Sequence, residues 1–216
     1  MGAARRMLRL LCVEFLLLGG LLSGQSLSAQ NNNEEHRVRN VVLVHGAWAD
    51  GSGYGGAVIT EAGTDPAVAG LVYIAAHMPD AGENEADDGK RFPSDLSKST
   101  GIKKTADGFT YLDPAQFHEY FAADLSAEQA AFMARSQVMN KADNFKAVIT
   151  TPAWRNKPSW MLVAGADRTI NPDLERWYAT RANSHKVEVS GASHSVYVSR
   201  PKEVAAVIEE AASQVR

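Results

Sequence analysis

Short apolar runs rich in β-branched residues constrain the fold of this 216-residue chain more than any other feature. Clear runs lie at residues 41–44, 70–77 and 160–164, and a shorter one lies at 186–189. Apolar residues occupy both faces of the first three segments, as in the strands of a parallel sheet that helices cover on both sides, and the fourth is a short strand. Helical patterns separate the runs, and this alternation is typical of α/β proteins. The sequence therefore predicts an α/β fold with a mostly parallel sheet and helices on both faces.

Helix-start signals lie between the predicted strands. Asp113 and Pro114 precede a helix predicted over 115–121, and Ser126 with Gln129 forms a capping-box pattern before a helix predicted over 127–139. Before these two helices, residues 78–109 are rich in glycine and polar residues and predict a loop. Two consecutive helices between strands predict a helical cap, which we assign to residues 80–155.

Three further helices are predicted in the remaining parts of the chain. A glycine-rich stretch leads into the first, at 57–62. Asn171 and Pro172 mark the start of the second, after the strand at 160–164. Apolar residues at helical spacing over 201–215 predict the third, with one buried stripe.

The first residues have the composition of an export signal. Three arginines precede an apolar run from Leu10 to Leu22, and small residues follow up to Ala29. The run is shorter than the ~20 residues that cross a bilayer as a helix, so no stable membrane anchor is expected after cleavage. We predict a signal peptide at 1–29, an exported protein, and a single domain over 30–216. The only cysteine, Cys12, lies in the signal, so the mature chain has no disulfide.

Charge and metal-ligand spacing narrow the range of partners. The formal net charge is −3 at pH 7, so there is no basic excess to neutralise a nucleic-acid backbone. His77 and His118 have no neighbouring residues at metal-ligand spacing and are predicted to be core or cap residues. The sequence therefore favours a small-molecule partner without a bound metal.

Polar residues that follow the predicted strands are the candidates for chemistry, because ligands of open α/β sheets bind beyond the carboxyl ends of the strands. Asp167 follows the strand at 160–164, and His194 follows the strand at 186–189. The order acid then histidine is that of a Ser-Asp-His triad after its serine. The other polar residues near predicted strand ends are His45, Ser52 and His77.

Several longer stretches resemble bacterial α/β-hydrolases of the small esterase type. They are VVLVHGAW (41–48), YGGAVITEAG (54–63), LVYIAAHMP (71–79), WMLVAGADRTINP (160–172) and GASHSVYVSRP (191–201). The resemblance implies hydrolysis of a small carboxylic ester by a Ser-His-Asp mechanism without a metal or organic cofactor. Asp167 would be the triad acid and His194 the base. The oxyanion would be held near His45, Gly46, Ala47 and Tyr54.

The nucleophile motif departs from that family. The family places its serine in G-x-S-x-G, directly before Tyr-Gly-Gly, whereas Gly53 stands at that position here and Ser52 lies one residue earlier. Only residues 47–53 separate the first predicted strand from the helix that follows, yet a parallel crossover needs a dozen residues or more. We therefore predict a shortened core, from which an internal deletion has removed the segment carrying the nucleophile. Ser52 is the remaining candidate nucleophile, and the activity is expected to be impaired.

Two other functions fit parts of the sequence. A non-catalytic or truncated homologue would keep the pocket and bind a small ester or an apolar molecule. A dinucleotide-binding oxidoreductase would use Gly51, Gly53 and Gly56, which satisfy G-x-G-x-x-G before a helix. The glycines do not directly follow the strand, and no acidic residue ends the next strand, so the sequence favours this function least.

Overall fold

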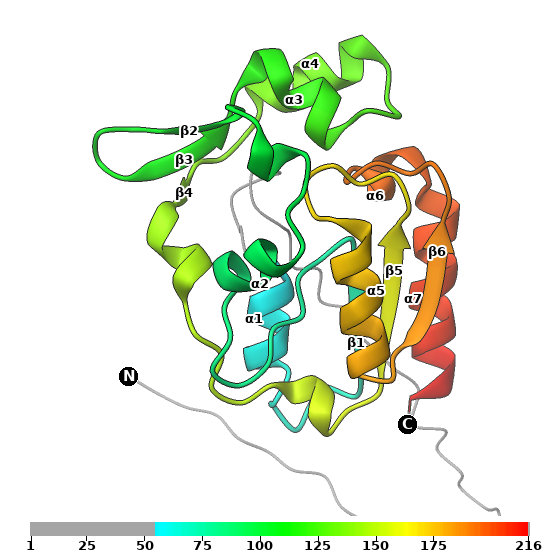
Figure 1. The fold of residues 1–216 in the computed structure, drawn as a ribbon. Coiled ribbons are helices and arrows are strands. Elements are labelled where there is room, and N and C mark those ends of the chain that lie inside the picture. The colour runs from blue at the N-terminus through cyan, green and yellow to red at the C-terminus, as the bar shows by residue number, and fades with distance from the viewer. Residues whose placement is uncertain (1–54, 216) are drawn as a thin grey trace, which may run out of the picture. The chain divides into compact units, whose positions relative to one another are not determined.

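A three-stranded parallel sheet forms the centre of the computed structural model, which describes residues 55–215 (Figure 1). The strands are β1 (Leu71–Ile74), β5 (Ser159–Ala164) and β6 (His185–Val189), in the order β1-β5-β6. In the β1–β5 register Leu71 lies opposite Ser159, and in the β5–β6 register Trp160 lies opposite His185. Three of the four predicted strands are confirmed, although β1 ends at Ile74. The fourth, at 41–44, lies outside the described residues.

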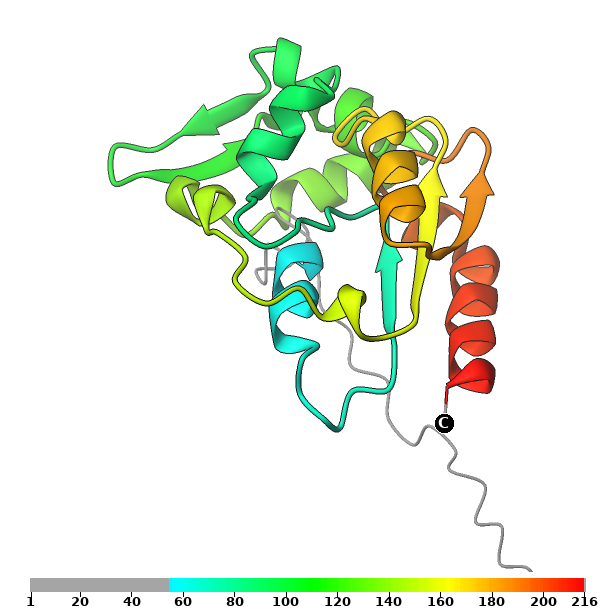
Figure 2. The ribbon, with the colours of Figure 1, turned by 60° about the horizontal axis from the view of Figure 1, so that its bottom comes forward.

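The side chains of β5 alternate between two apolar layers, one on each face of the sheet. Met161 and Val163 belong to the layer that contains Leu174 and Tyr178 of α5 (Pro172–Arg181). Trp160, Leu162 and Ala164 belong to the opposite layer, with Val207 and Ala211 of α7 (Pro201–Gln214). The two views in Figures 1 and 2 show α5 and α7 on opposite sides of the sheet. The predicted α/β architecture with helices on both faces is therefore confirmed.

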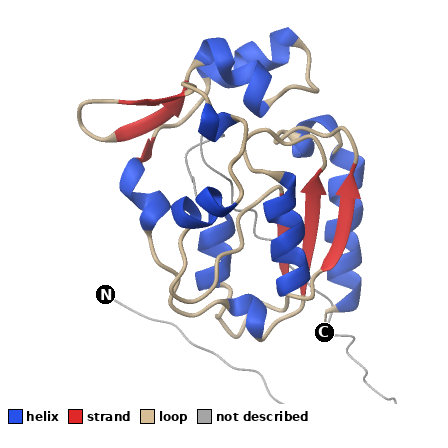
Figure 3. Ribbon diagram, in the orientation of Figure 1, coloured by secondary structure: helices blue, strands red, loops and turns tan. Residues whose placement is uncertain are grey.

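A second group of elements lies between β1 and β5 in the sequence (Figure 1), and Figure 3 shows that it contains both helices and strands. It contains a small antiparallel sheet in the order β2-β3-β4, and an apolar cluster under helices α3 and α4 that includes Leu112, Phe117 and Phe121. Its elements are α2 (Glu85–Arg91), η1 (Leu96–Lys98), β2 (Ile102–Lys104), β3 (Phe109–Leu112), α3 (Pro114–Phe121), α4 (Ala127–Arg135), β4 (Asn140–Lys141) and η2 (Ala142–Lys146). The prediction of a loop over 78–109 was wrong, and the predicted helical cap also contains strands.

The predicted helix starts carry the expected caps. Asp113 accepts a hydrogen bond from the Ala115 amide at 3.0 Å, and Ser126 forms a capping box with Gln129. Helix α4 ends at Arg135, four residues before the predicted end. The cause is Gln137, whose side-chain amide bonds both backbone groups of Leu112 on β3, at 2.9 and 2.8 Å.

The short helices α1 (Gly55–Ala62), η3 (Ala153–Arg155) and α6 (Val196–Ser199) complete the described secondary structure. Helix α1 is tied to β1 by Thr60, whose hydroxyl donates to the Gly56 carbonyl at 2.7 Å and lies 2.9 Å from the Tyr73 hydroxyl. Among the described residues, no helix has both the length and the apolar character that a membrane span requires.

Close packing of α1 against the segment after β1 makes Gly56 irreplaceable. A Cβ added at Gly56 would lie 1.9 Å from the carbonyl oxygen of His77, so Gly56→Ala forces the two segments apart. We expect a loss of about 1–3 kcal/mol in the free energy of unfolding, as for other overpacked sites. Gly89 of α2 is the matched control, because an added Cβ there meets no atom within 4 Å. Gly89→Ala should stabilise the protein by roughly 0.5–1 kcal/mol, and urea unfolding of both variants measures the contrast. Equal effects of the two changes would contradict the packing argument.

Candidate active site

Asp167 and His194 meet at the carboxyl edge of the parallel sheet. Asp167 lies in the turn after β5, and His194 lies in the loop after β6, the neighbouring strand. Their side chains form a hydrogen bond of 2.6 Å between His194 Nδ1 and Asp167 Oδ2. A carboxylate only accepts, so Nδ1 carries the proton and Nε2 is left as the atom that can receive one. The pair thus has the arrangement of a general base and the acid that orients it.

The turn after β5 holds the Asp167 carboxyl group in place. Its Oδ1 accepts hydrogen bonds from the backbone amides of Thr169 at 2.7 Å and Ile170 at 3.1 Å. The side chain has no exposed surface. With Oδ1 bound by two amides, Oδ2 is directed at His194, and the carboxyl group cannot rotate without breaking three hydrogen bonds.

Helix α3 anchors the loop that carries His194. The Phe121 ring contacts the His194 imidazole edge to face, with centroids 4.7 Å apart. The Phe121 carbonyl accepts hydrogen bonds from the Ser195 amide at 3.0 Å and the Ser195 hydroxyl at 2.9 Å. Both the ring and the backbone at the end of α3 therefore fix the position of the histidine. The sequence analysis assigned Phe121 only to a cap helix, because no motif links it to His194.

His77 lies at the same sheet edge and has a second polar network. Its Nδ1 lies 3.2 Å from the Tyr178 hydroxyl, which in turn donates to Asp88 Oδ2 at 2.8 Å. Since Tyr178 gives its proton to Asp88, Nδ1 of His77 is the donor to Tyr178. Desolvation, and then repulsion from His194 when that imidazole is protonated, lower the pKa of His77 to about 3, so His77 stays neutral at physiological pH.

Glu175 is a site residue that the sequence analysis missed. It lies on α5, has no exposed surface, and accepts a hydrogen bond from the Ala164 amide at 3.0 Å. Burial, and then the negative charge of Asp167, raise the pKa of Glu175 well above its ordinary value. The only signal in the sequence was an acidic residue between Leu174 and Tyr178, on the side of the helix expected to be buried.

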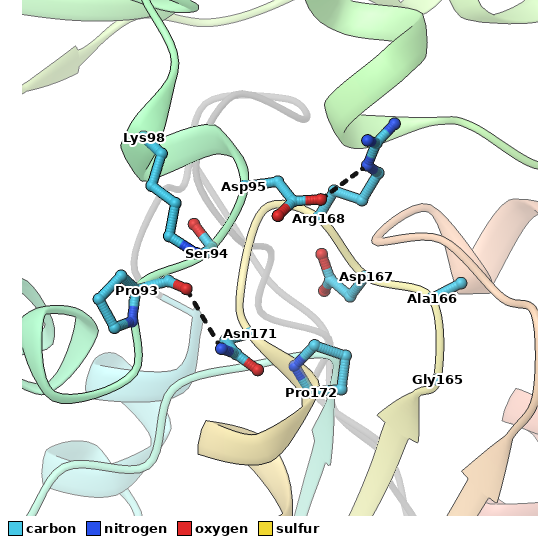
Figure 4. A pocket seen from close by; sticks show the side chains of 10 residues that line it. All are labelled: Pro93, Ser94, Asp95, Lys98, Gly165, Ala166, Asp167, Arg168, Asn171 and Pro172. Atoms are coloured by element: carbon cyan, nitrogen blue, oxygen red, sulfur yellow. Dashed lines mark hydrogen bonds and ion pairs between the residues drawn. The ribbon is translucent and has the colours of Figure 1, made fainter.

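A recess of about 380 Å³ opens beside the Asp167 turn (Figure 4). Two interactions join residues that line this recess. Arg168 pairs with Asp95 at 3.0 Å, and the Asn171 side-chain amide donates to the Pro93 carbonyl at 3.2 Å. The lining residues are Pro93, Ser94, Asp95, Lys98, Gly165, Ala166, Asp167, Arg168, Asn171 and Pro172. His194 is not among them, and the lining is mainly polar, so this recess lacks the features of an apolar ester pocket.

The remaining predicted site residues cannot be placed. Ser52, His45, Gly46, Ala47 and Tyr54 lie outside the described residues, as does the predicted signal peptide at 1–29. The nucleophile and the oxyanion site therefore remain predictions. Within residues 55–215, no group of three or more histidine, cysteine, aspartate or glutamate side chains has the geometry to hold a metal ion.

Comparisons with known proteins point to one family. The sequence model of the alpha/beta hydrolase family matches residues 51–207. The fold is similar to that of a methylesterase from Arabidopsis, with 15% identity and a TM-score of 0.60 over 74% of this chain and 66% of that chain. It is also similar to a pyrethroid hydrolase, with 19% identity and a TM-score of 0.58 over 74% of this chain and 68% of that chain.

A third similar structure is tomato methylketone synthase I in complex with 2-tridecanone, with 14% identity and a TM-score of 0.60. The match covers 77% of this chain and 70% of that chain. This chain thus spans about two-thirds of the length of these three relatives, and slightly less for the methylesterase. No curated protein sequence matches it.

Proposed function

The chain belongs to the alpha/beta hydrolase family, and from this premise we propose that it hydrolyses a small carboxylic ester by a Ser-His-Asp mechanism. The observation that carries the proposal is the 2.6 Å hydrogen bond between His194 and Asp167 at the carboxyl edge of the sheet. The loops that follow two neighbouring strands bring the two side chains together. A histidine with a purely structural role would not need a buried carboxylate on Nδ1. We assign the nucleophile to Ser52.

In the proposed reaction, the Ser52 hydroxyl attacks the ester carbonyl carbon and its proton moves to Nε2 of His194. Asp167 stabilises the resulting imidazolium through Oδ2. Backbone amides near Ala47 and Tyr54 would stabilise the negative oxygen of the tetrahedral intermediate. His194 then gives its proton to the departing alkoxide, which leaves as the alcohol. Water attacks the acyl-serine with His194 again as the base, and the carboxylic acid is released.

We propose a small, mainly apolar ester as the substrate class. Support comes from the names of the similar structures, which are a methylesterase, a pyrethroid hydrolase and a methylketone synthase in complex with the apolar ketone 2-tridecanone. The mechanism requires neither a metal nor an organic cofactor. We also propose that the signal at 1–29 exports the protein and that the mature chain starts near residue 30, with 80–155 as a cap.

A second function is favoured by one observation, the glycine at position 53 where the family has its serine. With no hydroxyl in reach of His194, the chain would bind a small ester or ketone without cleaving it. Labelling separates these two functions. A serine-reactive fluorophosphonate is added to the purified protein, and the labelled residue is identified by peptide mapping.

We expect a label on Ser52 that is lost in His194→Ala, because an unactivated serine hydroxyl reacts slowly. His118→Ala is the matched control, since His118 is exposed on α3 and its ring bonds the Leu125 carbonyl, away from Asp167 and His194; it should keep the label. A folded protein without any labelled serine would contradict ester hydrolysis and favour the binding function. Binding of NAD would instead support a dinucleotide-binding protein.

A further inference from the structure

The side chain of Glu175 occupies an unusual position behind the candidate triad acid. It has no exposed surface, and its Oε2 accepts a hydrogen bond from the Ala164 amide at 3.0 Å. Its Oε1 is also buried and receives no hydrogen bond from an N–H or O–H group of the described residues. An ionised carboxylate with one bare oxygen in a dry site is strongly disfavoured. The second oxygen of Glu175 therefore needs a partner or a proton.

Asp167 is the neighbouring carboxyl group, and it has the better donors. Its oxygens accept hydrogen bonds from two backbone amides and from His194 Nδ1, against a single amide for Glu175. Glu175 and Asp167 both bond the backbone of Ala164, whose amide donates to Glu175 Oε2 at 3.0 Å and whose carbonyl accepts from the Asp167 amide at 3.1 Å. The negative charge of Asp167 acts on the Glu175 carboxyl group from this position. Two neighbouring buried carboxyl groups do not both ionise readily, so the negative charge resides on Asp167, which has more donors, and the proton on Glu175.

We propose that Glu175 is a neutral positioning residue, whose protonated Oε1 donates a hydrogen bond to Asp167 and holds that carboxylate toward His194. The proposal rests on the proposed role of the His194–Asp167 pair. It also explains the orphan oxygen, because a contact between two carboxyl groups becomes a hydrogen bond only when one of them carries a proton. The positive charge of Arg176, the next residue on α5, opposes protonation of Glu175, but burial and the negative charge of Asp167 outweigh it and raise the Glu175 pKa.

Two substitutions separate the donor role from simple packing. Glu175→Gln keeps an oxygen for the Ala164 amide and a donor for Asp167, and it is always neutral. Glu175→Leu keeps a similar volume but removes both the donor and the acceptor. If Glu175 positions Asp167, the NMR resonance of the His194 Nδ1 proton should be unchanged in Glu175→Gln and shifted in Glu175→Leu. The resonance is assigned by its loss in His194→Ala.

Infrared spectroscopy tests the protonation state directly and covers the case in which Glu175→Leu does not fold. The C=O stretch of a protonated carboxylic acid should be present in the unmodified protein at pH 8 and absent in Glu175→Gln. Burial raises the pKa of Glu85 to about 7, so the Glu85 band should fade above that pH while the Glu175 band remains. Glu83→Gln is the matched control, because Glu83 forms an ion pair with Arg181 at 2.7 Å and its pKa is lowered. It should leave the band unchanged.

Three outcomes would overturn the proposal. They are the absence of an acid band assignable to Glu175, a resonance shift in Glu175→Gln as large as in Glu175→Leu, and no shift in either folded variant. Neither measurement uses an ester or depends on Ser52. Failure of the labelling experiment would overturn ester hydrolysis but leave the measured protonation and positioning of Glu175 intact, and failure of these two measurements would leave the labelling result intact.

Discussion

Replacing Asp167 with asparagine is expected to lower kcat for hydrolysis of a short-chain ester by about 10⁴-fold. The asparagine oxygen can still accept from the amides of Thr169 and Ile170, so the turn after β5 keeps its form. The side-chain NH₂ then faces His194 Nδ1, where the carboxylate oxygen had been. Because that NH₂ donates, Nδ1 must accept, and the imidazole proton moves to Nε2. The histidine can no longer take the proton of the serine.

The measurement is steady-state hydrolysis of a chromogenic ester, with unfolding in urea as the check on the fold. Asp173→Asn is the matched control, since Asp173 is exposed in the first turn of α5 and pairs with Arg176 of the same helix. It should hydrolyse the ester at the unmodified rate. An Asp167→Asn protein that is folded and retains its kcat would show that the pair has no role in hydrolysis.

The central sheet could be predicted from the sequence mainly because β5 is buried on both faces and β1 is almost entirely apolar. Val72 to Ile74 and Trp160 to Ala164 are nearly continuous apolar runs, which few other structures produce. The caps of α3, α4 and α5 were equally predictable, because each depends on residues within the same turn. Both kinds of signal are local, so no knowledge of tertiary contacts was needed.

The small sheet β2-β3-β4 could not be predicted, because its strands give no local signal and form through tertiary pairing. β2 has only three residues, two of them lysines, and β4 has only two residues. Neither has enough apolar residues to indicate a strand, and pairing with β3 stabilises both. The end of α4 likewise depends on a tertiary contact, that of Gln137 with Leu112.

The candidate site also contains residues with a local sequence signal and residues without one. Asp167 and His194 could be predicted because each directly follows a strand whose carboxyl end lies at the binding edge of the sheet. Glu175 and Phe121 could not, since they reach the pair from a helix face and from the end of a cap helix. Their roles depend on distances across the fold, and nothing in the spacing of their own segments indicates those distances.

The second large effect is expected at Phe121, the residue that connects the cap helix α3 to His194. Phe121→Ala should lower the free energy of unfolding by about 3–5 kcal/mol, as for other buried phenylalanines. Phe121 is 1% exposed, its ring centroid lies 4.8 Å from that of Phe117, and its ring contacts the His194 imidazole. Its loss leaves a cavity beside the imidazole, so the His194 Nδ1 proton resonance should shift or broaden as well.

Phe132 of α4 is the matched control for Phe121, because its side chain is 67% exposed and its removal leaves no buried cavity. Phe132→Ala should change the free energy of unfolding by no more than about 0.5 kcal/mol and leave the His194 resonance in place. Phe121→Leu adds a graded test, since it refills part of the cavity but cannot restore the edge-to-face contact. Stability should partly recover in that variant while the resonance remains displaced. If leucine restored both, side-chain volume would be sufficient at this position, and the edge-to-face contact with His194 would have no role of its own.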